Sequence, residues 1–564
     1  MTASDKPELR SVEAAAGRRV NPGDSIVERS AASGPATVGR YIVELLAANG
    51  IDTVFGIPGV HNLELYRGLQ ATGLRHVLVR HEQSAAFAAD GYARAAGRPA
   101  AAFVISGPGL TNALTGIAQA YADSVPLLVL ASTPERASLG KGWGVLHDLP
   151  DQGALAAGAT AFARTALTAQ DATDHLRAAF QAIRSPRARP AYVGLPLDLL
   201  GEHTTQRAEV FAHPAVQLPP DAAALERAVA LLDQARKPIL IAGGGARRAG
   251  QPLMRLAEAL DTYVVTTAAG KGILPETHPA SLGASLPYPP TQALIASADV
   301  VLAIGTELSD SDVYTTTRLP FDGKLIRIDV DPAKLSDHYG AAVALQADAA
   351  SCLTQLAQRV RARKGWRSEA GQAAEHRARL AQGLEAAMSG CAHAIRGVRA
   401  GLPAEAAVYT DMTQLAYHGT FAFEVSAPGC WHCPFGYGTL GYALPAAIGA
   451  KLGAPERPIV ALAGDYGLQF TLAELLTAVE AGVTLPIVLW NNEALGQIRD
   501  DMVRAGIGPL GVFARNPDFL ALARACGAEG TRVGDAQALA QALRRALGAR
   551  GPTLIECVAA DFAR

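Results

Sequence analysis

The sequence predicts an α/β protein with three doubly wound parallel-sheet domains. Short apolar runs that end in polar loops are typical of buried parallel strands, and segments with helical spacing separate them. A chain of 564 residues is too long for one ordinary domain, and its 49% apolar content is ample for three cores. No short-period repeat is present, so the repetition is of whole domains.

Composition shifts divide the chain into the predicted domains. Their expected bounds are residues 37–205, 215–355 and 395–564. The strands of the middle domain are expected near residues 238–242, 300–304 and 325–328, where short aliphatic runs occur. The first domain is expected to close with the run 191–196, and a charged helical linker over 361–379 leads into the third domain.

Residues 1–36 mix Arg, Glu, Ser, Gly and Pro without an apolar face, so we expect a flexible extension and not a secretory signal. No apolar run reaches the ~18 residues that span a bilayer. A formal net charge of -2 gives no basic excess for binding nucleic acid or anionic membranes. We therefore expect a cytoplasmic protein with neither kind of partner.

The six cysteines are too few and too scattered for a disulfide framework. Cys430 and Cys433 have the spacing of a redox couple or of half a zinc site, but no second such pair and no paired histidines accompany them. The role of this pair stays open.

The most informative feature lies in the third domain, where Asp465 and Asn492 each follow an apolar run. Residues 459–462 and 485–490 are expected to be buried strands, with a helix over 471–481 between them. The predicted apolar face of that helix carries Leu472, Leu475, Leu476 and Val479. Because the loops of a strand-helix-strand unit emerge at one edge of the sheet, Asp465 and Asn492 can reach a single ion.

A divalent cation such as Mg²⁺ takes oxygen ligands and commonly completes its shell with phosphate and water. One carboxylate, one amide oxygen and one backbone carbonyl suffice to hold it. Gly464 and Gly467 allow the backbone to approach a diphosphate closely. The alternative is an ordinary strand-end Asp and a turn made by Asn491 and Asn492, each common by itself.

These Gly-Asp and Asn-Asn pairs resemble the metal motif of the thiamine diphosphate enzymes in the acetolactate synthase and 2-oxoacid decarboxylase superfamily. The family motif is Gly-Asp-Gly, a spacer and Asn-Asn, and here Tyr466 stands in place of the second Gly. We expect this departure to alter packing beside the diphosphate more than metal ligation. The resemblance implies that Asp465, Asn492 and the carbonyl of Ala494 hold Mg²⁺.

Four further segments resemble the pyrimidine-binding domain of these enzymes. In order they are Phe55-Gly56-Ile57-Pro58-Gly59, Arg80-His81-Glu82-Gln83, Ala89-Asp90-Gly91-Tyr92-Ala93-Arg94 and Ser106-Gly107-Pro108-Gly109-Leu110-Thr111-Asn112. The resemblance covers nearly the whole chain after about residue 38. It implies a pyrimidine-binding, a central and a diphosphate-binding domain.

Glu82 is the candidate that activates the cofactor. Thiamine loses its thiazolium proton when a carboxylic acid hydrogen-bonds N1′ of the pyrimidine, and a carboxyl in an apolar pocket has the raised pKa that this requires. Small and apolar residues over 85–89 favour such a pocket. The alternative is a solvated ion pair between Glu82 and Arg80 or Arg94.

The stretch 436–447 looks like the loop that holds the two thiamine rings in a bent shape. By position, Leu440 supports the rings and the Gly438 carbonyl accepts from the 4′-amine, which brings the imino nitrogen next to the reactive carbon. A glycine-rich loop opening a buried helix is the plain alternative, and both can hold. The other cofactor contacts that the resemblance implies are Pro58, Pro108, Asn112, Thr413, Gln414, Gly464, Tyr466, Gly467, Leu495 and Gly496.

The resemblance also bears on assembly and on flavin. In the family the cofactor bridges the first domain of one subunit and the third domain of another, which implies at least a homodimer and favours a homotetramer. Related synthases bind FAD in the central domain. Their flavin-contacting segment is not recognisable around residues 305–309, and the three glycines at 243–245 lack the dinucleotide spacing. We therefore expect no FAD.

His61 and His147 are candidate proton relays, because a histidine titrates near neutral pH. His147 falls where synthases carry Gln and some decarboxylases carry His. Val60 and His61 are expected to line the substrate site. A purely structural role is the alternative for either histidine.

Asp500 and Asp501 stand in the segment where acetolactate synthases carry a Trp. A carboxylate facing the pocket favours a cationic substrate, above all a guanidinium bound bidentately. Adjacent residues on a helix do not share one face, so only one of the two is expected to point inward. The alternative is that both cap the helix or pair with Arg499 and Arg504 in water.

The segments 498–502 and 146–152 look like the branch of the family that contains the decarboxylase of 5-guanidino-2-oxopentanoate. The resemblance implies non-oxidative loss of CO₂ from this small 2-oxoacid, with 4-guanidinobutanal as the product. The alternative is an acetolactate synthase-like carboligase acting on pyruvate. A non-enzymatic thiamine-binding scaffold is disfavoured, because the activating acid and both metal side chains are present.

Overall fold

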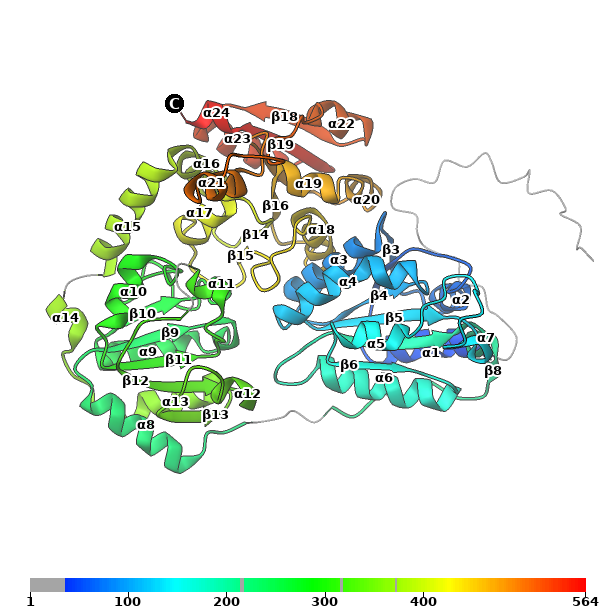
Figure 1. Cartoon of the computed structure of the whole chain (residues 1–564), viewed down its shortest axis with the longest axis horizontal. Helices are drawn as coiled ribbons and strands as arrows, with labels where there is room; N and C mark the ends of the chain where they lie inside the picture. The colour runs from blue at the N-terminus through cyan, green and yellow to red at the C-terminus, as the bar shows by residue number, and fades with distance from the viewer. Residues whose placement is uncertain (1–35, 214–217, 315–317, 371–372, 564) are drawn as a thin grey trace, which may run out of the picture.

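Three parallel sheets flanked by helices form the frame of the protein (Figure 1). The computed structural model describes residues 36–213, 218–314, 318–370 and 373–563, so the extension expected over 1–36 lies outside the described residues except for Ala36. The predicted fold class, α/β with three doubly wound domains, is confirmed. In the part of the chain that the structure describes, no helix combines the length and the apolar character needed to cross a membrane.

The first domain has a six-stranded parallel sheet in the order β3-β2-β4-β5-β7-β6. Its strands are β2 (Thr53–Gly56), β3 (Arg75–Leu78), β4 (Ala100–Val104), β5 (Leu127–Thr133), β6 (Phe162–Thr165) and β7 (Ala191–Pro196). Its helices are α1 (Val38–Ala48), α2 (Leu63–Thr72), α3 (Glu82–Ala96), α4 (Pro108–Ala122), α5 (Gln152–Ala157), α6 (Ala169–Ile183) and α7 (Leu197–Gly201). Side chains of α1 and α6 form the core on one face of the sheet, and those of α3 and α4 form the core on the other.

The central domain has a five-stranded parallel sheet in the order β10-β9-β11-β12-β13. Its strands are β9 (Pro238–Ala242), β10 (Tyr263–Thr266), β11 (Val300–Ile304), β12 (Lys324–Asp329) and β13 (Val343–Gln346). Its helices are α8 (Ala222–Gln234), α9 (Gly250–Leu260), α10 (Pro289–Ala296), α11 (Asp310–Val313), α12 (Pro332–Leu335) and α13 (Ala349–Arg359). The linker to the third domain contains α14 (Trp366–Ala370) and α15 (Ala373–Ala387), where one helical stretch was expected.

The third domain has a six-stranded parallel sheet in the order β15-β14-β16-β17-β19-β18. Its strands are β14 (Ala407–Thr410), β15 (Trp431–His432), β16 (Ile459–Gly464), β17 (Leu485–Asn491), β18 (Glu529–Val533) and β19 (Pro552–Val558). Its helices are α16 (Ser389–Gly401), α17 (Gln414–Ala422), α18 (Ala443–Gly453), α19 (Asp465–Phe470), α20 (Glu474–Glu480), α21 (Gly496–Arg504), α22 (Phe519–Ala525), α23 (Ala536–Ala546) and α24 (Ala559–Phe562). In addition, β1 (Ala36–Thr37) pairs antiparallel with β8 (His203–Thr204).

The first and third sheets have the same topology, because their strands follow the same relative order. The chain direction across the sheet reverses between β2 and β4 in the first domain and between β14 and β16 in the third. Ligands of open α/β sheets bind beyond the carboxyl ends of the strands at this point. The repeated domain therefore provides two edges suited to binding a ligand.

One helix of the third domain differs from its predicted form. The helix expected over 471–481 begins only at Glu474, because residues 471–473 form turns. Leu475 and Ala478 provide its buried apolar contacts, whereas Leu476, which was predicted to face the core, is 38% exposed. The prediction for Leu476 was wrong because the shorter helix presents a narrower face to the sheet.

The first and third domains meet where α3 packs against α18. A side chain at Gly91 would overlap the Ala446 carbonyl, and one at Gly449 would overlap the Ala88 carbonyl. The two backbones are therefore in direct contact, which only glycine permits. Glu82 is the first residue of α3, so this contact fixes the candidate catalytic acid relative to the third domain of the same chain.

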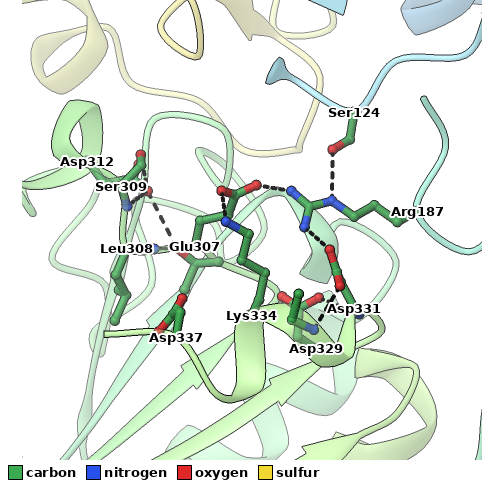
Figure 2. A network of polar contacts seen from close by, with 12 residues as sticks. Ser124, Arg187, Glu307, Leu308, Ser309, Asp312, Asp329, Asp331, Lys334 and Asp337 are labelled. Atoms are coloured by element: carbon green, nitrogen blue, oxygen red, sulfur yellow. Dashed lines mark hydrogen bonds and ion pairs between the residues drawn. The ribbon is translucent and has the colours of Figure 1, made fainter. Parts of the chain in front are cut away.

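The first and central domains are joined by an ion network around Arg187 (Figure 2). Arg187 pairs with Glu307, and its Nη1 lies 2.5 Å from Asp331 Oδ2. Its Nε donates to Ser124 Oγ at 3.3 Å, and Lys334 pairs with Glu307 at 2.7 Å. Figure 2 shows the guanidinium of Arg187 reaching from the first domain between two carboxylates of the central domain.

Replacing Gly449 by alanine is expected to separate α3 from α18 and lower the free energy of unfolding by about 1–3 kcal/mol, the usual penalty of overpacking. Gly383→Ala is the matched control, because Gly383 is exposed on α15 and nothing lies within 4 Å of an added Cβ there. That variant should gain about 1 kcal/mol from helix propensity. Thermal melting followed by circular dichroism measures both, and equal melting temperatures for the two variants would contradict the close contact.

Candidate active site

The predicted site residues gather at the carboxyl ends of the first and third sheets. In the first domain Pro58 follows β2, Glu82 follows β3 and Pro108 follows β4. In the third domain Asp465 follows β16, and Asn492 follows β17. Each sheet therefore contributes one half of the candidate site at its topological reversal.

Asp465 is the central group of the third-domain half and is 2% exposed. Its Oδ2 accepts a hydrogen bond from Asn516 Nδ2 at 2.7 Å, and the same amide donates to Asn491 Oδ1 at 2.9 Å. The backbone N–H of Tyr466 donates to Asp465 Oδ1 at 3.0 Å. Burial raises the pKa of Asp465, and the Asn516 hydrogen bond opposes that rise. The two loops predicted to converge do lie together.

Gln414 links this cluster to the start of α17. Asn492 Nδ2 donates to Gln414 Oε1 at 3.2 Å, and the backbone N–H of Ala494 donates to Asn492 Oδ1 at the same distance. Gln414 is the first residue of α17, where free N–H groups and the helix dipole favour an anion. The position suits a diphosphate bound between α17 and the candidate metal ligands Asp465 and Asn492.

Two glycines allow the backbone after β16 and β17 to lie close to the start of α17. A Cβ at Gly464 would lie 2.9 Å from Thr413 Oγ1, and a Cβ at Gly496 would lie 2.5 Å from Gln414 Oε1. Tyr466 and Leu495 are half-buried beside them. Side chains at the two glycines would therefore collide with Thr413 and Gln414 at the start of α17.

The donor set of the third-domain half suits a hard cation. Asp465 offers a carboxylate, Asn492 an amide oxygen and Ala494 a backbone carbonyl, which are the donor types that Mg²⁺ takes. Within the described ranges, no three His, Cys, Asp or Glu side chains are grouped so that they could hold a metal ion. A site made of one carboxylate, one amide and one carbonyl needs no such group.

Asp411, which the sequence did not single out, connects the diphosphate side to the loop at 436–442. Both of its carboxylate oxygens accept from the Gly441 N–H at 3.0 Å, and a side chain at Gly467 would overlap its Oδ2. Burial raises the pKa of Asp411 to about 7. Gly438 has φ of 73°, a left-handed conformation that glycine tolerates, and Leu440 accepts from a side chain of the first domain.

Glu82 is 9% exposed at the start of α3 and is the centre of the first-domain half. Its Oε2 accepts a hydrogen bond from Asn112 Nδ2 at 3.0 Å. Arg80 and Arg94 pair with other carboxylates, so the alternative ion pair with Glu82 is not the arrangement found. Around Glu82 the side chains of Pro58, Pro108 and Asn112 are exposed at the same edge.

The structure brings His61 and His147 together from separate segments. Their ring centroids are 4.8 Å apart, with 62° between the ring planes. His61 Nδ1 lies 2.5 Å from Ser106 Oγ, and burial, aided by His147, lowers the pKa of His61. His147 has φ of 64°, and its Nδ1 is buried without a partner in the described part of the chain. Val60 beside them is 67% exposed.

Asp500 and Asp501 differ in their partners. Asp500 Oδ2 accepts from Gln414 Nε2 at 2.8 Å, and its Oδ1 lies 2.7 Å from Arg499 Nη2. Asp501 instead pairs with Arg504 and accepts from the side chain of a neighbouring glutamine on α21. The pairs with Arg499 and Arg504, which were the alternative to a role in substrate binding, are therefore both present. Of the two aspartates, Asp500 also connects through Gln414 to Asn492.

Sequence reasoning missed three polar side chains that hold this site. Asn516 bridges Asp465 and Asn491, yet it is a single asparagine in an irregular segment and gives no motif. Ser106 lay inside a quoted family segment, but its contact with His61 depends on the fold. Gln152 ended the quoted segment 146–152, but its contact with the first-domain loop, where its Oε1 accepts from the Gly107 N–H at 2.8 Å, depends on the fold.

Comparison with family models identifies all three domains. The thiamine pyrophosphate enzyme N-terminal TPP binding domain matches residues 36–155, the central domain matches 225–356, and the C-terminal TPP binding domain matches 411–557. This chain belongs to the thiamine pyrophosphate enzymes. Thiamine pyrophosphate is another name for thiamine diphosphate, so the predicted family and its cofactor are confirmed.

Relatives of this thiamine pyrophosphate enzyme cover nearly its whole length. The probable 2-ketoarginine decarboxylase of Pseudomonas aeruginosa is 50% identical over 532 residues, which are 92% of this chain and 93% of that protein. The acetolactate synthase large subunit of Corynebacterium glutamicum is 32% identical over 548 residues, with 92% and 86% covered. The acetolactate synthase isozyme 1 large subunit of Escherichia coli is 31% identical over 534 residues, with 92% and 93% covered.

The central domain of this thiamine pyrophosphate enzyme borders a cavity of about 1830 Å³ shared with the other two domains. Gly244, Gly245 and Thr306 line it at the carboxyl edge of the central sheet. Glu307, in the segment where a flavin contact was sought, pairs with Arg187 and Lys334. The expected absence of FAD stays a prediction.

Replacing Asp465 by asparagine is expected to weaken binding of Mg²⁺ and thiamine diphosphate by at least about tenfold, or ~1.4 kcal/mol. The reason is that the variant removes the one carboxylate of the proposed metal site while keeping its shape. Titration calorimetry with the cofactor at fixed Mg²⁺ measures the change. Asp501→Asn is the control, since Asp501 pairs with Arg504 and not with Gln414. An unchanged affinity for thiamine diphosphate in Asp465→Asn would refute the assignment of Asp465 as a metal ligand.

Proposed function

We propose that this thiamine pyrophosphate enzyme is a non-oxidative 2-oxoacid decarboxylase that converts 5-guanidino-2-oxopentanoate to 4-guanidinobutanal and CO₂. The observation that carries the substrate proposal is the carboxylate of Asp500, joined through Gln414 to Asn492. The name of the 50% identical relative, a probable 2-ketoarginine decarboxylase, supports the same chemistry.

Asp500 is the proposed anchor of the substrate guanidinium, and Asp501 is not. Gln414 holds one oxygen of Asp500 toward the cofactor side, while Arg499 occupies the other. A half-exposed ion pair such as Asp500 with Arg499 contributes little free energy. A substrate guanidinium that forms a bidentate bond can therefore share or replace Arg499 at this carboxylate.

The cofactor roles follow the two halves of the site. When bound, thiamine diphosphate supplies the carbon that adds to the 2-oxo group and accepts the electrons released with CO₂. Asp465, Asn492 and the Ala494 carbonyl would hold Mg²⁺, and the start of α17 with Gln414 would hold the diphosphate. Glu82, held by its Asn112 hydrogen bond, would protonate and orient the pyrimidine.

His61 and His147 would move the proton that turns the decarboxylated adduct into an aldehyde. Their contact provides two imidazoles in sequence, and the lowered pKa of His61 keeps that ring neutral at pH 7. A neutral imidazole beside a second one can accept and pass on a proton. Ser106, at 2.5 Å from His61 Nδ1, would fix which nitrogen carries the hydrogen.

We further propose at least a homodimer, with a homotetramer expected, working in the cytoplasm. Among the described residues, no hydrogen bond or ion pair joins Glu82, His61 or His147 to the cluster around Asp465. Large exposed apolar side chains flank both halves. In the first domain they are Val60, Leu63, Trp143 and Leu146, and in the third domain Phe470, Ile498, Leu510 and Phe513. Such side chains mark an interface, and a second subunit would cover them while completing the site.

The alternative function is an acetolactate synthase-like carboligase acting on pyruvate. Two relatives with acetolactate synthase names support it at 31% and 32% identity, which is less than the 50% of the decarboxylase-named relative. A carboxylate at the proposed anchor position of Asp500 would also disfavour a second acidic substrate. Formation of acetolactate from pyruvate alone would favour the alternative.

Replacing Glu82 by glutamine is expected to leave cofactor binding within about twofold and to lower kcat by at least about 100-fold, because the amide keeps a hydrogen bond but carries no acidic proton. Calorimetry measures cofactor binding, and CO₂ release measures turnover. Glu480→Gln, which removes an exposed partner of Arg80 outside the site, is the control. Full turnover in the Glu82 variant would remove its assigned role.

Replacing Asp500 by asparagine is expected to lower kcat/KM for 5-guanidino-2-oxopentanoate by about 10–100-fold, since a charged hydrogen bond to the guanidinium is worth roughly 1.5–3 kcal/mol. Apolar 2-oxoacids should change little. CO₂ release from a panel of cationic, apolar and acidic 2-oxoacids, with and without thiamine diphosphate and Mg²⁺, measures both. Asp501→Asn is the control and should have the smaller effect on kcat/KM. If the wild-type enzyme preferred 2-oxoacids with apolar or acidic side chains, the role of Asp500 as guanidinium anchor would be refuted, while the cofactor assignment would stand.

A further inference from the structure

A second cavity of about 370 Å³ lies between the linker and the third domain, away from the two sheet edges that form the candidate active site. Residues of α15, α16 and α17 line it, together with Glu276 and Gly283 of the central domain. Figure 1 shows α15 running between the central and third domains. The volume is within the range of about 300–1,000 Å³ that is usual for sites of small molecules.

His418 of α17 lines this cavity and is 4% exposed. Its Nδ1 is buried, and the ring makes no hydrogen bond in the described part of the chain. Burial, together with Arg396, lowers the pKa of His418, so the ring is neutral and offers one donor and one acceptor. A buried polar group without a partner costs free energy, which points to a ligand that hydrogen-bonds this ring.

Two charged groups of the lining are already satisfied. Glu276 lies 2.6 Å from Lys271 Nζ through one oxygen and accepts from the Val425 N–H at 2.9 Å through the other. Arg396 pairs with Glu385 at 2.9 Å. Because each of these charges has a partner of opposite sign within the protein, neither pair requires a charged ligand.

Two other groups of the lining have no ionic partner. Arg377 donates to the Ser281 carbonyl, and no carboxylate lies within ion-pair distance of it among the described residues. Glu424 likewise has no cation at that distance in the described ranges, and it is exposed to the cavity side. Arg377 and Glu424 are near enough to interact electrostatically without touching. Among the described residues of the lining, the cavity therefore presents one cation and one anion that lack an ionic partner, set apart from each other.

We propose that this cavity binds a small zwitterion of the α-amino acid class. The ligand carboxylate would bind Arg377, its cationic group would bind Glu424, and a further polar atom would bind His418. A guanidinium on Arg377 can hold a carboxylate through two parallel hydrogen bonds. Phosphates and polyamines fit poorly, because each carries charges of one sign only and would leave either Glu424 or Arg377 without a partner.

An occupant would touch the helix that presents Gln414 to the metal side of the active site. His418 lies one turn after Gln414 on α17, and Phe421 and Ala422 of the same helix also line the cavity. A ligand that steadies α17 should therefore raise the affinity for thiamine diphosphate, and by linkage the cofactor should raise the affinity for the zwitterion equally. The cavity is then a candidate regulatory site.

Calorimetry on the full-length holoenzyme tests the proposal with L-arginine as the probe, because it carries a carboxylate and two cationic groups. Agmatine, which lacks the carboxylate, and pentanoate, which lacks the cation, are the matched ligands. We expect millimolar or tighter binding of L-arginine and at least tenfold weaker binding of the other two. Arg377→Gln and Glu424→Gln should each weaken L-arginine binding at least tenfold, while Arg377→Lys keeps part of it and controls for misfolding.

Two control variants separate this cavity from the active site. Arg379→Gln changes a neighbouring arginine of α15 that does not line the cavity, and Asp500→Asn changes the proposed substrate anchor; both should bind L-arginine within twofold of the wild type. Absence of binding, equal binding of agmatine or pentanoate, or unaltered binding in Arg377→Gln and Glu424→Gln would overturn the proposal. Loss of binding in Asp500→Asn alone would also overturn it, because L-arginine would then occupy the active site.

Discussion

The packing of α3 on α18 is the constraint on which the arrangement of this enzyme depends. Gly91 and Gly449 bring the two helices into backbone contact, so their separation and crossing are fixed by atoms that cannot move apart without losing the interface. Glu82 begins one helix, and the loop at 436–442 leads into the other. One close contact therefore positions the candidate catalytic acid of the first domain relative to the loop of the third domain that is expected to support the thiamine rings.

The third-domain half of the site is held by neutral amides around one buried carboxylate. Asn516 and the Tyr466 backbone hydrogen-bond Asp465, and Gln414 hydrogen-bonds both Asn492 and Asp500. Amides orient a carboxylate without neutralising it, whereas an arginine in their place would compete with a cation. The negative charge of Asp465 thus stays available for a metal, and the same amide chain extends to the proposed substrate anchor.

Much of the fold and part of the site could be predicted from local sequence. The runs that became β16 and β17 are apolar on both faces, so they indicated buried parallel strands, and the edge position of Asp465 and Asn492 followed from topology. Leu476 was misplaced because periodicity shows which residues are apolar and not which neighbour covers them.

The sequence alone determined the fold class, the family and the cofactor, and it singled out the candidate site residues, because these depend on residue type and on spacing along the chain. Only the tertiary structure showed that Asp500 hydrogen-bonds Gln414 whereas Asp501 pairs with Arg504, brought His61 onto Ser106 and His147, and placed Asn516 against Asp465. The physical reason is that these choices rest on side-chain contacts between segments far apart in sequence. Such contacts are set by how helices and sheets pack, which no local pattern encodes.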